Sequence, residues 1–387
     1  MAQLGGAGGA GGAGGAGGAG GAGGAGGAGG AGGAGGAGGA GGSFLGTMAD
    51  AYANSIMVDA LIQGREGTIV PEFNCYAPAL PTKIDDALQL ERWEPWVRAY
   101  TAIGEMLQGI GFATAGSNGF QVQSSQIVTS SGSTSYVIAK LERPDQQKTF
   151  VAQIPLVASW AELRNERATE ILAQIDPQYA FWSSIIYMHP DRTKRTFELI
   201  NILLQFCVYV EMRFKQALAC WRPVEYNAEI QPMITTPGHG SFPSGHSTQA
   251  HAVAYVLKQL LKLDKAKVGY PQIKDQLDRQ AARIAVNRTV AGVHFPVDSM
   301  AGRMLGVALG EYFVGRCLGT TTALKSRTFN AAWIDSSPST DFNPFSADQG
   351  LAAGKLYSES AGANITRSDL MKQLWDNAQA EWAIRFP

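Results

Sequence analysis

The chain has 387 residues, of which 16% are charged, and its 31 basic and 32 acidic side chains leave a formal net charge of −1. Such a balance gives no electrostatic footprint for nucleic acid or an anionic membrane, so we expect neither partner. Charged residues are sparser than the ~25% of an average globular protein, which predicts a deep core and a homo-oligomer in which a second subunit covers part of the surface.

A Gly-Gly-Ala repeat occupies the chain from Gly5 to Gly42. Because no side chain in it is larger than a methyl group, the repeat cannot bury enough apolar surface to offset its chain entropy. It also lacks the proline that pre-forms the collagen helix. We therefore expect residues 1–42 to be a low-complexity tail or linker, with an ordered polyglycine-type packing as the alternative.

No segment predicts entry into a membrane or a secretory pathway. The N-terminus lacks the basic start, apolar stretch and cleavage site of a secretory signal. The longest strongly apolar segment, Leu199 to Val210, is much shorter than the ~20 residues that a spanning helix needs. The four cysteines are widely spaced, without a C-x-x-C pair. The sequence thus predicts a soluble, cytoplasmic protein without a membrane span.

Residues 43–158 are predicted to form an N-terminal helical region that contains a small β-hairpin. Several prolines interrupt its first part, which favours short helices and long connections. Near residues 120–156, two stretches alternate between apolar and polar residues, Ser135 to Ala139 and Thr149 to Ala152. Their alternation predicts the two strands of the hairpin.

Residues 159–335 are predicted to form the main helical domain, because apolar residues recur there at three- and four-residue spacing. The expected helices are Ala161–Ile175, Thr193–Trp221, Ser247–Leu263, Ile273–Val286 and Val297–Leu318. Residues 336–387 are expected to form a C-terminal arm, Ser336 to Ala361, and a last helix, Ser368 to Ala383. The predicted fold is therefore an all-α helical bundle with one small hairpin and a Gly-Gly-Ala tail.

Four of the five histidines lie between positions 239 and 294, and three segments around them carry the candidate chemistry. The first segment runs from Lys215 to Pro223. Seven residues at about 100° each bring Lys215 and Arg222 within about 20° of one helix face, and Pro223 must end the helix. Two neighbouring cations suit an anion, although a solvated basic helix end is the alternative.

The second segment, Pro243-Ser244-Gly245-His246, leads directly into a predicted helix. Small residues at a helix start leave backbone N–H groups open to an oxyanion, and the Ser244 hydroxyl adds a donor. His246 would then stand at the edge of an anion cradle. The alternative is an N-cap made by Ser244 or Ser247 beside a packed His246.

The third segment runs from Asn287-Arg288 to His294 and Asp298. Asp298 follows His294 by four residues, so it can accept a proton from one ring nitrogen and leave the other free as a nucleophile or a ligand. A satisfied histidine at a loop-to-helix junction is the alternative.

Together the three segments provide two arginines, a lysine, helix N-terminal amides and two histidines, a set that suits a phosphate-like oxyanion. In a phosphoryl transfer, His294 would attack phosphorus and His246 would give a proton to the leaving oxygen.

These segments resemble the three-part signature of the superfamily of type 2 phosphatidic acid phosphatases and vanadium-dependent haloperoxidases: Lys-x6-Arg-Pro, Pro-Ser-Gly-His and Ser-Arg-x5-His-x3-Asp. They have the family's order and internal spacings, and the resemblance covers about residues 170 to 320. One departure is Asn287, which stands where the family usually has serine and bears on how Arg288 is held.

The resemblance implies a helical bundle of the acid phosphatase/vanadium haloperoxidase type with the anion among its helices. It implies that His246 is the acid–base, that His294 is the residue phosphorylated or bound to vanadate, and that Asp298 orients His294. The same resemblance implies that the oxyanion is held by Lys215, Arg222, Ser244, Gly245 and Arg288.

Among the branches of that family, the sequence favours a haloperoxidase-like enzyme that oxidises halide with hydrogen peroxide at a His294-bound vanadate. Trp221 and His239 are similar to features of that branch and are candidate pocket residues, whereas His251 is interpreted as a core or surface histidine. The first alternative is a soluble phosphatase that hydrolyses phosphomonoesters through a phosphohistidine intermediate and needs no cofactor. A second is an assembly or scaffold protein that retains an oxyanion site.

Overall fold

A computed structural model describes residues 55–69, 83–128, 135–175, 178–320 and 323–387. The Gly-Gly-Ala repeat and Cys75 lie outside these ranges. The chain divides into two compact units at Tyr100 and Thr101. We describe each unit by itself.

The described residues of the first unit are mainly helical. Helix α4 (Ser55–Thr68) exposes the side chains of Ile56 and Ile62. The short 3-10 helix η1 (Ala87–Arg92) is capped by Asp86, whose carboxylate accepts the Leu88 N–H at 3.0 Å. Helix α5 (Pro95–Leu107) begins in this unit and continues past the boundary.

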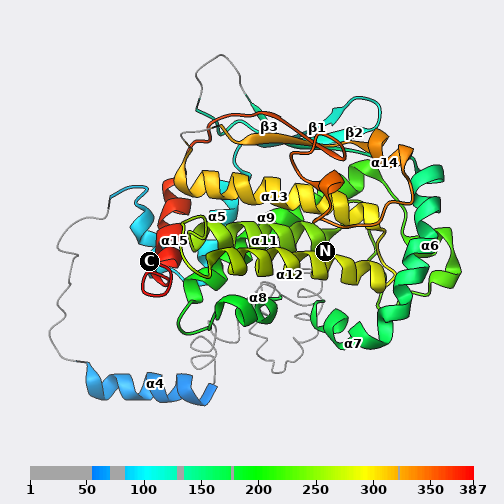
Figure 1. The fold of residues 1–387 in the computed structure, drawn as a ribbon. Helices are drawn as coiled ribbons and strands as arrows, with labels where there is room; N and C mark the ends of the chain where they lie inside the picture. Colours follow the sequence, from blue (N-terminus) through cyan, green and yellow to red (C-terminus); the bar gives the residue numbers. More distant parts are fainter. Residues whose placement is uncertain (1–54, 70–82, 129–134, 176–177, 321–322) are drawn as a thin grey trace. The chain divides into compact units, whose positions relative to one another are not determined.

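A helical bundle forms most of the second unit, and α11 lies at its centre, packed against α9, α12 and α13 (Figure 1). These four are the long helices, α9 (Lys194–Leu218), α11 (Gly245–Leu260), α12 (Tyr270–Val290) and α13 (Pro296–Leu318). The shorter ones are α6 (Val151–Trp160), η3 (Ala161–Leu163), α7 (Arg164–Ala173), α8 (Tyr179–Ile186), α10 (Pro223–Tyr226), η4 (Ala228–Ile230), α14 (Ala331–Ser336), η5 (Ala347–Gln349) and α15 (Asp369–Ala380). Over the described residues, none of the helices has the length and apolar character needed to cross a membrane.

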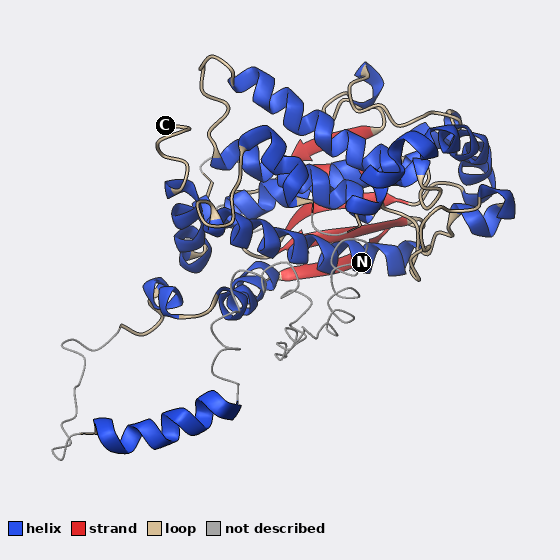
Figure 2. Ribbon diagram, turned by 90° about the horizontal axis from the view of Figure 1, so that it is seen from below, coloured by secondary structure: helices blue, strands red, loops and turns tan. Residues whose placement is uncertain are grey.

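One five-stranded sheet covers the face of the bundle that α13 and α9 present (Figures 1 and 2). Its strands follow the order β1-β2-β3-β4-β5, with only the β3–β4 pair parallel. The strands are β1 (Ile110–Ala115), β2 (Gly119–Ser124), β3 (Tyr136–Glu142), β4 (Lys325–Phe329) and β5 (Tyr357–Ala361).

The predicted all-α class is therefore wrong in one respect, because the mostly helical unit carries this sheet. Its first three strands form a meander, and its last two come from the far end of the chain. The parallel pairing joins Ala139 to Arg327. A contact between residues so distant in sequence leaves no mark in local alternation, which is why β4 and β5 were not predicted.

The second strand of the predicted hairpin, Thr149 to Ala152, is helical instead. The Asp145 carboxylate accepts the N–H groups of Gln147 and Lys148, at 2.9 and 3.1 Å, and so starts a π-helical turn, η2 (Gln146–Phe150). That turn leads without a break into α6. A side-chain cap thus overrides a four-residue alternation.

The helices expected after residue 159 are present, but the one over Thr193–Trp221 ends early, at Leu218. Ala219 adopts a left-handed conformation, with φ 48°, and its N–H bonds to the Lys215 carbonyl. Arg222 is extended before Pro223, as a residue preceding proline prefers. Lys215 and Arg222 therefore do not share a helix face, contrary to the prediction from their seven-residue spacing.

Three glycines on α13, spaced four residues apart, bring that helix close to α11. A Cβ atom added at Gly302 would lie 2.6 Å from the Ser244 carbonyl oxygen, and one at Gly306 would lie 2.1 Å from the Thr248 carbonyl oxygen. At Gly310 the added atom would meet the Ala252 carbonyl oxygen at 3.2 Å. This glycine stripe lets the two backbones touch, so the start of α11 lies beside the start of α13.

Candidate active site

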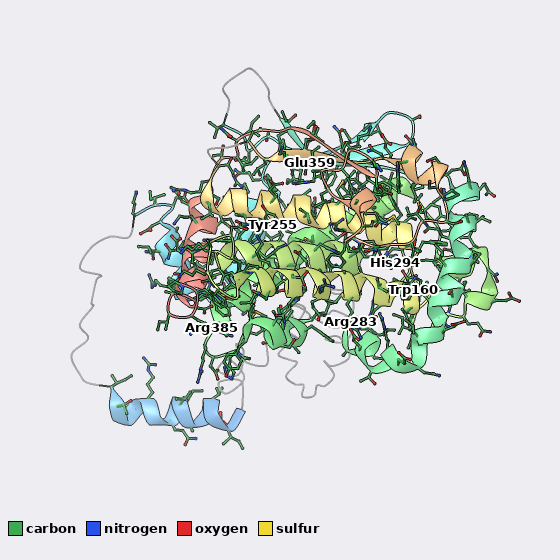
Figure 3. All side chains as sticks on the ribbon, in the orientation of Figure 1. Trp160, Tyr255, Arg283, His294, Glu359 and Arg385 are labelled. Atoms are coloured by element: carbon green, nitrogen blue, oxygen red, sulfur yellow. The ribbon has the colours of Figure 1, made fainter. Side chains whose placement is uncertain are left out.

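The three segments singled out from the sequence meet at one end of the bundle. Figure 3 shows His294 at this end, towards α6 and Trp160. Two backbone hydrogen bonds join the segments: Ser241 N–H donates to the Cys220 carbonyl at 2.9 Å, and Ser244 N–H donates to the Asp298 carbonyl at 2.9 Å. The glycine stripe holds α11 and α13 at the distance that the second bond requires.

His294 is buried and held in one tautomer. Its Nδ1 lies 2.9 Å from Asp298 Oδ2, as the four-residue spacing predicted, and its Nε2 lies 3.0 Å from Arg222 Nη1. A guanidinium nitrogen can only donate, so Nε2 carries a lone pair and Nδ1 carries the proton. Burial, followed by the charges of Arg222 and Lys215, keeps the pKa of His294 well below 6.5. The ring is therefore neutral, with an unprotonated Nε2.

Asp298 collects donors on one oxygen. Its Oδ2 accepts from His294 Nδ1, from the Ser241 hydroxyl and from the Phe295 N–H at 2.9 Å. Burial raises the pKa of Asp298, while the bonds from Ser241 and Phe295 favour its ionised form. These donors fix the carboxylate and, through it, the orientation of the imidazole.

Arg222 connects two of the three segments. Besides His294, its Nη1 donates to the Val293 carbonyl at 2.7 Å, and its Nε donates to the His239 carbonyl at 3.0 Å. Its Nη2 lies 3.1 Å from His239 Nδ1. Burial lowers the pKa of Arg222 to about 10, so the guanidinium stays charged at neutral pH.

Lys215 is almost fully buried and points into the loop before α11. Its ammonium group donates to the carbonyl oxygens of Gly240, Ser241 and Pro243, at 3.2, 3.0 and 2.5 Å. Three acceptors use all three ammonium protons. Burial, and next the charge of Arg222, lowers the pKa of Lys215. Lys215 therefore holds the loop and also places a positive charge beneath it.

Ser244 is the N-cap of α11, and its Oγ accepts the Ser247 N–H at 3.4 Å. Gly245 and His246 occupy the first helical positions, where N–H groups have no acceptor within the helix and suit an anion. A larger residue at Gly245 would require the Glu211 carboxylate to move, because an added Cβ would lie 2.7 Å from Glu211 Oε1. The buried Glu211, one helical turn before Lys215, was not predicted, although a lone carboxylate after the apolar run Leu199–Val210 could have signalled it.

His246 is held from α7. Its Nε2 donates to the Gln174 carbonyl at 2.7 Å, so Nε2 carries the proton in the neutral ring. The buried Nδ1 has no partner among the described residues. Burial and the charge of Arg288 keep the pKa of His246 well below 6.5.

Arg288 reaches the site from the last turn of α12. Its Nη2 donates to the Ile171 carbonyl at 3.1 Å and to Gln174 Oε1 at 3.0 Å. Asn287 Nδ2 donates to the same Gln174 oxygen at 3.0 Å. Burial lowers the pKa of Arg288 to about 9, so it too is charged at neutral pH. Gln174 carries no motif, and sequence reasoning missed it.

Trp221, His239 and His251 differ in how deeply they are buried. Trp221 is 58% exposed and packs against the Tyr226 ring, with ring centres 6.0 Å apart. His239 is partly buried beside Arg222, and burial lowers its pKa to about 3. His251 is buried and donates from Nδ1 to the Ser247 carbonyl at 2.8 Å, which agrees with its interpretation as a core residue.

The donor set fits a tetrahedral oxyanion, phosphate and vanadate included. Arg288 Nε and Nη1 are buried and have no hydrogen-bond partner among the described residues. Buried donors of a cation are costly to leave unpaired, so an anionic acceptor compensates them. The other two cations, Lys215 and Arg222, are also buried, and hydrogen bonds through Ser241, Asp298 and His294 connect them.

Comparison with known proteins gives three findings. Residues 197–316 match the model of the PAP2 superfamily. A curated relative, the vanadium-dependent bromoperoxidase of Ascophyllum nodosum, is 31% identical over 91 residues, which covers 18% of this chain and 16% of that protein. A solved structure, the first transmembrane PAP2 type phosphatidylglycerolphosphate phosphatase from Bacillus subtilis, is 18% identical and covers 42% of this chain and 92% of that chain, with a TM-score of 0.24. That TM-score is too low to bear on the arrangement of the helices.

The chain therefore contains a segment, residues 197–316, that matches the PAP2 superfamily. Every site residue expected from the sequence lies within this segment. Gln174 lies outside it. The aligned segment spans only about a sixth of the length of the bromoperoxidase.

Proposed function

We propose that this chain is a vanadium haloperoxidase-like enzyme, in which buried cations hold vanadate against His294 and halide is oxidised by hydrogen peroxide. The observation that carries the proposal is the neutral His294. Its unprotonated Nε2 accepts a hydrogen bond from Arg222, while its Nδ1 donates to Asp298. The likeness to a bromoperoxidase favours vanadate over phosphate as the resident oxyanion.

In this proposal each side chain has a separate task. His294 Nε2 and the free N–H groups of Arg288 hold the oxyanion, with Arg222, Lys215, Ser244 and Gly245 completing its surroundings. Asp298 keeps the proton on His294 Nδ1, and His246 Nδ1 is placed to hold or release a proton. Vanadate, when bound, supplies the Lewis-acid centre that activates peroxide towards attack by halide.

A phosphatase acting on small phosphomonoesters is the second candidate, and the position of His246 favours it. Its Nε2–H is fixed on the Gln174 carbonyl, so Nδ1 is the atom that can carry a mobile proton. His294 Nε2 would form a bond to phosphorus as the ester P–O bond breaks, and His246 Nδ1 would give its proton to the leaving oxygen. A bound phosphate would raise the pKa of His246, because the negative charge of the phosphate would offset the positive charge of Arg288, which lowers that pKa.

Two assays on the full chain separate these candidates. The first follows bromination of a phenol dye by hydrogen peroxide and bromide, with and without added vanadate. The second follows hydrolysis of an aryl phosphate. We expect vanadate-dependent bromination, which His294→Ala lowers by about 10³-fold or more because it removes the oxyanion's nitrogen ligand. His189→Gln, on a half-buried histidine outside the three segments, serves as the control and should retain activity.

Phosphate hydrolysis that is lost in His294→Ala, without bromination, would replace the first candidate by the second. Oxyanion binding without turnover in either assay would support the scaffold alternative. A homo-oligomer and a cytoplasmic location stay predictions from the sequence.

A further inference from the structure

Gln174 lies at the C-terminal end of α7, upstream of the segment that matches the PAP2 superfamily, and is completely buried. Three helices meet at it. Its carbonyl oxygen accepts from His246 Nε2 of α11 at 2.7 Å, and its amide oxygen accepts from Asn287 and Arg288 of α12. One residue outside that segment therefore contacts two of the side chains expected to act on the oxyanion.

The Gln174 amide oxygen accepts a hydrogen bond from only one nitrogen of the Arg288 guanidinium, Nη2. Gln174 Oε1 and the Ile171 carbonyl both accept from Nη2, at 3.0 and 3.1 Å. The other donors, Nε and Nη1, are buried without a partner among the described residues. Both acceptors are neutral, so they fix the guanidinium without compensating its charge.

The carboxylate nearest to this pair is already engaged. Glu170 accepts three hydrogen bonds from Arg283, at 2.7 to 3.0 Å, and a fourth from Gln174 Nε2 at 3.0 Å. Gln174 thus stands between the Glu170 carboxylate and the Arg288 guanidinium, donating to one and accepting from the other. A carboxylate in its place would neutralise Arg288 directly.

We infer that Gln174 is a positioning residue of the oxyanion site: its neutral amide fixes Arg288 through Nη2 and keeps the positive charge and the remaining N–H groups for the oxyanion. The inference rests on the proposed oxyanion site. Asn287 belongs to the same arrangement, because its Nδ2 donates to Gln174 Oε1 while its Oδ1 accepts from Arg167 at 3.0 Å. Asn287, which stands where the family usually has serine, thereby helps to hold Gln174.

The test measures the affinity of the full chain for orthovanadate by calorimetry at pH 6, 7 and 8. The affinity of each variant is divided by that of the wild type at the same pH. This ratio removes the effect of the protonation of vanadate itself. Gln174→Glu should bind at least tenfold more weakly at pH 8, because a carboxylate would compete for Arg288. This deficit should persist at pH 6, since pairing with Arg288 would keep the carboxylate ionised. The charged and titratable groups facing position 174 are Glu170 and Arg167 of α7, His246 of α11, and Arg283 and Arg288 of α12.

Gln174→Met removes the acceptor without adding charge, so it should weaken binding several-fold and equally at the three pH values. It also tests the inference if Gln174→Glu does not fold. Gln349→Met is the matched control, because Gln349 is buried and its amide oxygen accepts from the Asn343 N–H and not from Arg288. Wild-type affinity in both Gln174 variants, or an equal deficit in both at every pH, would overturn the inference. Absence of vanadate binding by the wild type would instead overturn the proposed function.

Discussion

At the scale of single residues, Lys215 both holds the loop before α11 and contributes a positive charge. Its ammonium group is fully used by three loop carbonyls, yet its charge lies in the same cluster as Arg222 and Asp298. Lys215 would therefore act on an oxyanion mainly through its charge. A direct hydrogen bond from Lys215 to the oxyanion would require one of the three carbonyls to be displaced.

This arrangement predicts that oxyanion affinity falls as the pH rises through neutrality. The pKa of Lys215 is lowered to about 7, and a lysine is charged only below its pKa. Anion binding favours the charged form, so binding takes up a proton above pH 7 and weakens by up to tenfold per pH unit. The affinity advantage of wild type over Lys215→Met, measured by calorimetry with orthovanadate, should be constant below about pH 6.5 and shrink above pH 7.

Lys258→Met provides the control, since Lys258 is paired with Asp278 at 2.6 Å and not with the loop. An advantage of wild type over Lys215→Met that stays constant from pH 6 to pH 9 would contradict the prediction.

Much of the candidate site could be predicted because its residues lie in three short motifs. His294 lies in the loop just before α13 and Asp298 lies in the first turn of that helix, so their four-residue spacing predicts the contact. Gln174 could not be found in this way. Its contacts with His246 and Arg288 exist only after three helices have packed, and glutamine has no chemistry that would single it out in a sequence.

At the scale of secondary-structure elements, the contact between α11 and α13 sets the geometry of the site. The glycine stripe on α13 replaces side-chain packing by backbone contact, and the hydrogen bond from Ser244 N–H to the Asp298 carbonyl lies at the end of this contact. The position of the α11 N-terminus relative to His294 therefore depends on glycine at these positions.

Gly306→Ala should destabilise the protein by at least about 2 kcal/mol, because the new Cβ atom would lie 2.1 Å from the Thr248 carbonyl and the helices would have to separate. Gly104→Ala is the control. Gly104 is inside α5 with no atom within 4 Å of an added Cβ, so alanine should stabilise by about 0.5–1 kcal/mol. Urea unfolding of both variants checks the pair, and equal effects would show that the close approach is unimportant.

The helices after residue 159 were predictable because their apolar residues repeat over many turns. The short strands were not, because β4 and β5 have five residues each and include charged side chains such as Arg327 and Glu359. These two pair with each other, with Arg327 Nε 3.0 Å from Glu359 Oε1, so their burial depends on a partner that local patterns do not reveal. The early end of α9 at Leu218 was not predictable either, because Ala219 adopts a left-handed conformation that alanine rarely takes.

At the scale of the whole molecule, the bundle buries three of its histidines in the neutral state. Burial is the main cause of the lowered pKa of His246, His251 and His294. In the unfolded chain each would have a pKa near 6.5. Folding therefore excludes protons that the unfolded chain takes up below that value.

The protein should consequently lose stability as the pH falls below about 6.5. A histidine with a lowered folded-state pKa contributes its full stability above the unfolded value and loses it as the pH falls towards the folded value, about 3 for His251. Each such histidine adds up to about 1.4 kcal/mol per pH unit to the slope. Urea unfolding between pH 7.5 and pH 5 should show this slope, reduced in His251→Gln. A free energy of unfolding that is level across this range would refute the expectation.

The glycine stripe also bears on how such a site can diversify. Two backbones in contact leave no side chain to enlarge or trim, so the spacing between the start of α11 and the start of α13 cannot be adjusted by small substitutions. New substrate preferences would have to arise in residues outside this contact, such as the exposed Trp221 or the partly buried His239. The oxyanion centre is then inherited unchanged, while the approach to it is free to vary.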